Sequence, residues 1–324
     1  MSSSLRLPIA CVAVALALAA GVSRAGTDVI FGNGFEPPPP PTFVVTTPTA
    51  TIGPGEEVSY CFYFRTPNAA TIGVRRLEST LSVAASALFV YATYSGSTPT
   101  ELQPPGTFTT TNCGAGGGGS GTFSKRIYQT QLPTFALQMP SSDGAGVPLA
   151  IELLAAQPLY MEVHFLNASD SPVSGSAQLA VFALPTATPY TRTAAYMTYN
   201  GDINIPAMST GTASANCAVP ASTKFWWFST QTHRFATSAT LRNGAQTLVV
   251  STDWQNPAIA QFGPPSFYQF AAAERLTYEC TYNNNLSQTI RTGDSWATDE
   301  NCIGLAYFFP ATTPLLCFNN FGPF

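Results

Sequence analysis

From residue 42 onward the chain consists of short stretches in which residue types alternate, and each stretch is ended by Pro, Gly, Asn or Asp. Such alternation suits strands, whose successive side chains point to opposite faces. Asn243-Gly244 separates two of these stretches, and both residues tolerate the positive φ of a type I′ hairpin turn. Strands are therefore predicted at residues 57–64, 150–154, 159–166, 177–184, 224–232, 239–242, 246–251, 275–282 and 303–309.

Helical patterning is almost absent from the same region. The sequence has one weak 3.6-residue period, at residues 77–88. The chain contains 27 Pro and 25 Gly and is 12% aromatic, a composition typical of a β-rich protein with many turns. We therefore predict an all-β fold made of antiparallel β-sandwiches.

The first 25 residues have the pattern of a secretory signal peptide. Arg6 precedes a 12-residue apolar run (9–20), and Ser23-Arg24-Ala25 is a cleavage site of the small-x-small type. Residues 26–41 include five consecutive prolines and are predicted to be a polyproline tether. No later apolar run reaches 18 residues, so we expect a secreted or periplasmic protein with no membrane span.

Two proline residues in the segment 184–189 indicate a boundary near the middle of the remaining chain. We predict one β-sandwich domain at residues 42–184 and a second at residues 185–324. Each is about 140 residues long, which is enough to bury one core. The glycine run 114–121 is expected to be a surface loop.

Removal of the signal peptide takes away Cys11 and leaves six cysteines. An even number in an exported chain predicts three disulfides, with about 15 pairings allowed by count alone.

Charge and histidine content narrow the possible functions. Only 9% of residues are charged, the net charge is -4 and no Lys/Arg run occurs, so nucleic acid is not expected as a partner. The chain has two histidines, His164 and His233, which excludes an active site built only from several histidines.

Several motifs follow one another between residues 215 and 320. They are Gln231-Thr232-His233, Leu241-Arg242-Asn243-Gly244, residues 253–257, residues 276–283, Asp299-Glu300-Asn301-Cys302 and Tyr307-Phe308-Phe309-Pro310. In order and spacing this part of the chain resembles the C-terminal domain of the copper type II, ascorbate-dependent monooxygenases, the family of peptidylglycine α-hydroxylating monooxygenase and dopamine β-monooxygenase. A weaker resemblance covers residues 85–91 and 161–167 and Cys61 in the first half.

The resemblance implies two jelly-roll β-sandwich domains in tandem with one copper site on each. It also implies the disulfides Cys280–Cys302, Cys217–Cys317 and Cys61–Cys113. The family's first copper site requires three histidines, and its second requires a His-x-His pair and a methionine. Here His164 and His233 remain, whereas the other aligned positions are Ala85, Ser86, Gln231 and Asn301.

One imidazole with amide oxygens is a poor ligand set for copper(I). We therefore expect no cofactor, with copper bound only if a site is retained. Gln231 and His233 share a strand face, and Asn301 is expected beside them, so a polar cluster is predicted there. Glu162 shares the strand face of His164 and is its expected partner.

The resulting hypothesis is a secreted, degenerate homologue that binds an unknown small molecule or surface partner without copper catalysis. No catalytic residue is assigned. One alternative is an active copper-dependent monooxygenase that hydroxylates a C–H bond, with metal on His233. Another is an amidase-like or carbohydrate-binding β-sandwich. It would use the carboxylate pairs Glu56-Glu57 and Asp299-Glu300, or the tryptophans Trp226, Trp227, Trp254 and Trp296.

Overall fold

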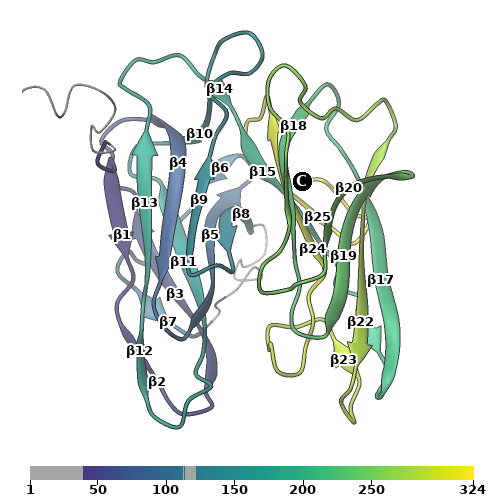
Figure 1. The fold of residues 1–324 in the computed structure, drawn as a ribbon. Coiled ribbons are helices and arrows are strands. Elements are labelled where there is room, and N and C mark those ends of the chain that lie inside the picture. The colour runs from purple at the N-terminus through teal and green to yellow at the C-terminus, as the bar shows by residue number, and fades with distance from the viewer. Residues whose placement is uncertain (1–38, 112, 114–121) are drawn as a thin grey trace, which may run out of the picture. The chain divides into compact units, whose positions relative to one another are not determined.

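The structure is a computed structural model that describes residues 39–111, 113 and 122–324 (Figure 1). Over these residues the chain forms strands and no helix, which confirms the all-β prediction. Each strand predicted from the sequence overlaps an observed one. The predicted signal peptide, residues 26–38 of the tether and the glycine run 114–121 lie outside the described residues. No helix in the described ranges is long and apolar enough to cross a membrane.

Strands from the first half of the chain form two six-stranded sheets and a small two-stranded one. Sheet 1 has the order β1 (Phe43–Thr46), β13 (Ala177–Ala183), β4 (Ile72–Leu81), β10 (Leu149–Leu153) and β14 (Thr191–Arg192), and β9 (Thr134–Gln138) also pairs with β4. Sheet 2 has the order β6 (Thr98–Pro99), β5 (Ala85–Ser95), β11 (Pro158–Leu166), β3 (Glu57–Arg65) and β7 (Phe108–Thr109), and β8 (Thr122–Thr130) also pairs with β5. The small sheet pairs β2 (Ala50–Ile52) with β12 (Val173–Gly175).

Strands from the second half form two further sheets and another short pair. Sheet 3 has the order β21 (Ile259–Gln261), β18 (Lys224–Gln231), β24 (Ile303–Phe309), β15 (Ala194–Tyr199) and β25 (Leu315–Phe318). Sheet 4 has the order β17 (Ser209–Ala218), β22 (Arg275–Asn284), β19 (Ala236–Asn243) and β20 (Gln246–Ser251). The short pair joins β16 (Asn204–Ile205) and β23 (Ile290–Arg291).

Residues 41–324 form one compact unit. Strands up to β13 pair with one another, and those from β15 onward pair among themselves. The exception is β14, which follows the expected boundary but pairs with β10 of sheet 1. The division into domains at residues 184 and 185 stays a prediction.

The centre of sheet 3 is buried on both faces, as the burial of all seven residues of β24 shows. Along β15, Ala194 and Tyr196 pack in the core of the second half, whereas Ala195 and Met197 pack in the first-half core. Tyr307 Oη on β24 donates a hydrogen bond to the carbonyl oxygen of Ile127 on β8, at 3.0 Å. A continuous apolar core therefore joins the two halves and holds their facing surfaces in place.

The weak helical period at residues 77–88 corresponds to no helix. Leu77 and Leu81 are buried positions on β4, and a turn containing Ala84 at φ 77° leads into β5. A spacing of four residues is compatible with a helix, but it also places two side chains on one strand face. The period was therefore ambiguous, and strand pairing decides the outcome.

The structure contains the disulfides Cys61–Cys113, Cys217–Cys317 and Cys280–Cys302. These are the same three pairs that the family resemblance implied. The Cys280–Cys302 bond joins β22 of sheet 4 to the residue before β24 of sheet 3. It therefore fastens Asn301, the neighbour of Cys302, to the core of the second half.

Candidate functional site

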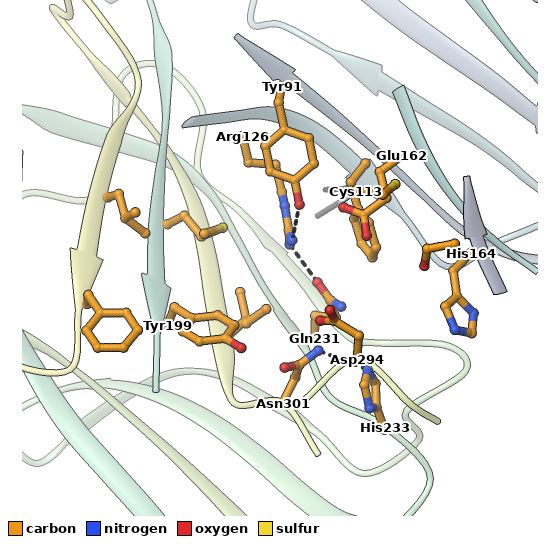
Figure 2. A pocket seen from close by; sticks show the side chains of 16 residues that line it. Tyr91, Cys113, Arg126, Glu162, His164, Tyr199, Gln231, His233, Asp294 and Asn301 are labelled. Carbon is orange, nitrogen blue, oxygen red and sulfur yellow. Dashed lines mark hydrogen bonds between the residues drawn. The ribbon is translucent and has the colours of Figure 1, made fainter. Parts of the chain in front are cut away.

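A cavity of about 400 Å³ lies where the outer face of sheet 2 meets sheet 3 (Figure 2). Strand alternation creates this face: on β5, Leu88 and Val90 enter the first core, so Phe89 and Tyr91 point the other way. The cavity is lined by Ser59, Phe89, Tyr91, Cys113, Arg126, Glu162 and His164 from the first half, and by Met197, Tyr199, Gln231, His233, Asp294, Asn301, Ile303, Leu316 and Phe318 from the second.

Four sequence-predicted site residues thus border one cavity: His164, Gln231, His233 and Asn301. The resemblance had implied a separate site on each domain. Ser86 does not line the cavity but contacts His164, and Ala85 lies opposite Phe165 in the pairing of β5 with β11.

The ring of His233 is neutral and held in one tautomer. Its Nδ1 lies 3.2 Å from the carbonyl oxygen of Asp299, which only accepts, so Nδ1 carries the hydrogen. Nε2 then accepts a hydrogen bond of 2.9 Å from Nδ2 of Asn301. Burial lowers the pKa of His233 to about 4, so the ring is uncharged at pH 7. This arrangement fixes the Asn301 amide and leaves its Oδ1 buried without a partner.

His164 is bound by residues of the first half. Its Nδ1 lies 2.8 Å from Ser86 Oγ, and its Nε2 lies 3.1 Å from Glu57 Oε1. The expectation of Glu162 as the partner is therefore wrong. The register of β3 and β11 places Ser59 opposite His164, so Glu57, two residues away on β3, reaches the same face.

The donors at these positions do not fit a copper centre. Both ring nitrogens of His164 and both of His233 already have protein partners. The nearest aligned side chains, Ser86 and Asn301, offer a hydroxyl and an amide, which are weak ligands for copper(I). Within the described ranges, no three His, Cys, Asp or Glu side chains are grouped so that they could hold a metal ion.

Trp296 lies between the two histidines. Its ring centroid is 5.1 Å from that of His164 and 4.7 Å from that of His233. Glu57 accepts hydrogen bonds from the backbone N–H of Trp296 and from Ser295 Oγ, the latter at 2.9 Å. We call these five residues, Glu57, His164, His233, Ser295 and Trp296, the Trp296 clamp. It ties a second-half loop to β3 of the first half.

Replacing Glu57 with Gln is expected to weaken the Trp296 clamp and to change the acid stability. Burial opposes ionisation of Glu57, but hydrogen bonds from His164, Trp296 and Ser295 outweigh it and lower the pKa to about 2. A lowered carboxyl pKa stabilises the fold above the unfolded value of 4.5, and this contribution is lost as the pH falls toward 2. Urea unfolding between pH 6 and pH 2.5 should show a smaller decline for Glu57→Gln than for the wild type. An unchanged pH profile would contradict the clamp.

The buried side chain of Arg126 forms part of the cavity wall. Nη1 of Arg126 donates to Oε1 of Gln129 at 2.5 Å and to Oε1 of Gln231 at 2.6 Å, and Nη2 donates to Tyr91 Oη at 2.8 Å (Figure 2). The guanidinium carbon lies 4.2 Å from the ring centroid of Phe89. Arg126 Nε is buried without a partner. The bond to Gln231 links the two halves directly across the cavity.

Two carboxyl groups face the same space. Burial raises the pKa of Glu162 to about 7, with Arg126 opposing and Asp294 reinforcing the shift. Burial also raises the pKa of Asp294. Sequence reasoning did not identify Arg126 or Asp294. Arg126 lies in a strand that also holds Lys125 and several polar residues, so no local pattern distinguishes it. Nothing local marks Asp294.

The residues proposed for the carbohydrate-binding and amidase-like alternatives are engaged elsewhere. Trp226, Trp227 and Trp296 are each at most 3% exposed, and no tryptophan lines the cavity. Glu57 belongs to the Trp296 clamp, and Glu300 accepts backbone hydrogen bonds inside the protein. The geometry therefore favours neither a tryptophan groove nor a free carboxylate pair.

No protein-family model and no curated protein matches the chain. Among solved structures, the PBSX exported protein XepA is 10% identical, with 82% of this chain and 86% of that chain covered at a TM-score of 0.20. A structure of infectious bursal disease virus Gx strain is 11% identical, with 82% and 80% covered at a TM-score of 0.11. Likenesses this weak support no conclusion about fold or function.

Proposed function

We propose that the protein is a secreted binding protein that holds a small molecule in the cavity between its two halves. The cavity of about 400 Å³ falls in the size range of small-molecule sites. The observation that carries the proposal is the pair of unpartnered buried polar atoms on its lining residues, Arg126 Nε and Asn301 Oδ1. Because a buried unpaired polar group costs about 1 to 3 kcal/mol, a bound ligand that satisfies both would be stabilised.

We further propose that the chain descends from the copper monooxygenase frame and lacks copper catalysis. Ser86 contacts His164 and Asn301 contacts His233, so residues aligned with the family's ligands are neighbours in space. Their hydroxyl and amide groups bind the rings through hydrogen bonds. These contacts support a site that has been converted from metal binding to hydrogen bonding.

A thermal-shift screen of the full chain against small organic molecules tests this function. A ligand present at about 100 times its Kd should stabilise the fold by about 2.7 kcal/mol and raise Tm by several degrees. Ser59→Phe should abolish the shift, because Ser59 lines the cavity and the larger ring would fill it. Ser238→Phe on β19, away from the cavity, is the matched control and should keep the shift.

Two outcomes would contradict the proposal. One is a ligand shift that Ser59→Phe leaves intact. The other is stoichiometric copper retained after dialysis together with ascorbate-dependent oxygen uptake that His233→Ala abolishes, which would favour the active monooxygenase.

A further inference from the structure

We propose that the cavity ligand is a small zwitterion: one carboxylate and one ammonium group on an apolar body, as in a free α-amino acid with an apolar side chain. This inference rests on the proposed binding function and deepens it by naming the ligand class. It is carried by the arrangement of a partly unpaired guanidinium, an unpaired amide oxygen and an acidic side chain around one cavity.

Arg126 has donor capacity left for a carboxylate. A guanidinium has five N–H donors. Three of them are used, two on Nη1 by Gln129 and Gln231 and one on Nη2 by Tyr91. Nε remains without a partner on a side chain that is 4% exposed. Nε and Nη2 form the edge with which arginine binds a carboxylate through two parallel hydrogen bonds.

The ammonium group has its own acceptors on the second-half wall. Asn301 is 5% exposed, and its Nδ2 donates to Nε2 of His233. The Oδ1 atom of Asn301 is therefore left to accept a hydrogen bond. Asp294 lies on the same wall and supplies a negative charge (Figure 2). Glu162, on β11 in the first-half wall of the cavity, adds a second carboxyl group.

The charges of the lining argue against a ligand with one charge only. A simple anion on Arg126 would lie near the carboxyl groups of Glu162 and Asp294 and would add a further negative charge that Arg126 alone has to balance. A simple cation beside Asp294 would leave Arg126 Nε buried and unpaired. A zwitterion satisfies both sides at once, which is the complementarity that binding sites achieve with fixed charges.

The rest of the second-half wall is apolar and suits an aliphatic body. Met197, Ile303 and Leu316 line it, together with the rings of Tyr199 and Phe318. Burial of an aliphatic side chain against such a surface favours binding, because it removes apolar area from water.

Calorimetric titration of the full chain with three matched compounds tests the inference. Leucine carries both charges, 3-methylbutylamine lacks the carboxylate, and 4-methylpentanoate lacks the ammonium. Leucine is expected to bind at least about tenfold more tightly than either analogue, because each charged hydrogen bond lost costs more than 1.4 kcal/mol.

Variants assign each charge to a residue. Asp294→Asn should weaken leucine at least about tenfold and leave 4-methylpentanoate no weaker than before. Arg126→Lys keeps the charge but removes the Nε edge, and it should weaken leucine by a similar factor. Asp253→Asn, on a carboxyl group that faces solvent, is the matched control and should change nothing. If the Arg126 variant fails to fold, Asp294→Asn decides the result alone.

The outcomes separate this inference from the function on which it rests. Equal affinity for leucine and an analogue, or binding of one analogue alone, overturns the zwitterion while the binding function stands. The same holds if none of the three compounds binds but another screened molecule does, in a manner sensitive to Ser59→Phe. If no compound binds at this cavity, the binding function itself fails.

Discussion

Replacing Glu300 with Ala is expected to lower the free energy of unfolding by about 3 to 6 kcal/mol. The side chain is fully buried, and its oxygens accept hydrogen bonds from the backbone N–H groups of His233 at 2.9 Å, Phe235 at 2.6 Å and Asn301 at 3.3 Å. Alanine would leave these three donors buried without partners, at about 1 to 2 kcal/mol each. Urea or guanidinium unfolding monitored by tryptophan fluorescence measures the loss.

The control is Glu279→Ala, which removes a partly exposed pair with Arg242 and should cost less than about 1 kcal/mol. Similar losses for the two variants would contradict the assigned role of Glu300.

The pH dependence of the stability provides a second test of Glu300. Burial raises the pKa of Glu300 to about 7, although the backbone donors oppose the shift. The folded state therefore binds the proton more tightly than the unfolded state. Its contribution to stability is complete below pH 4.5 and is lost as the pH rises through 7. Glu300→Gln, which cannot ionise, should flatten this decline, and Glu162 and Asp294, whose pKa values are also raised, contribute to the part that remains.

Replacing Trp296 with Ala is expected to destabilise the protein by about 3 to 5 kcal/mol. The side chain is 3% exposed and contacts the rings of His164, His233 and Trp254. Its removal would leave a cavity at the centre of the Trp296 clamp and loosen the loop that carries Asp294. Chemical denaturation gives the stability, and titration of the cavity ligand should show weaker binding.

Trp254→Ala is the matched control. Trp254 is partly exposed and contacts the ring of Trp296 from outside the clamp, so its loss should cost clearly less. Trp296→Phe keeps an aromatic ring between the histidines and should retain part of the stability. Equal losses for Trp296→Ala and Trp254→Ala would show that Trp296 does not hold the two halves together.

Strand patterning predicted much of the fold because it is a local property. The Asn243-Gly244 turn and the alternation in residues 159–166 specify a hairpin and a strand whatever the rest of the chain does. The pattern of residues 303–309 predicted a strand, but the burial of this strand on both faces follows from a core shared by the two halves. No local pattern shows which other sheet will cover a given face.

At the candidate site, too, some features were predictable from the sequence and others were not. The two-residue spacing of Gln231 and His233 predicted a shared strand face, but β18 ends at Gln231 and His233 lies beyond the strand. Both side chains nevertheless line one cavity. Their separate partners were not predictable: Arg126 is 105 positions from Gln231, and Asn301 is 68 positions from His233. Contacts over such separations depend on how sheets pack.

The sequence alone determined the all-β class, the positions of the strands and the shortage of histidines. Composition can be counted directly, and period-two alternation acts within a few residues. The tertiary structure alone decided that His164 and His233 lie on either side of Trp296, that Glu57 holds that loop, and that Arg126 and Asp294 face one cavity. Alternation sets which side chains share a face, but only the packing of sheet 2 against sheet 3 sets which two faces meet.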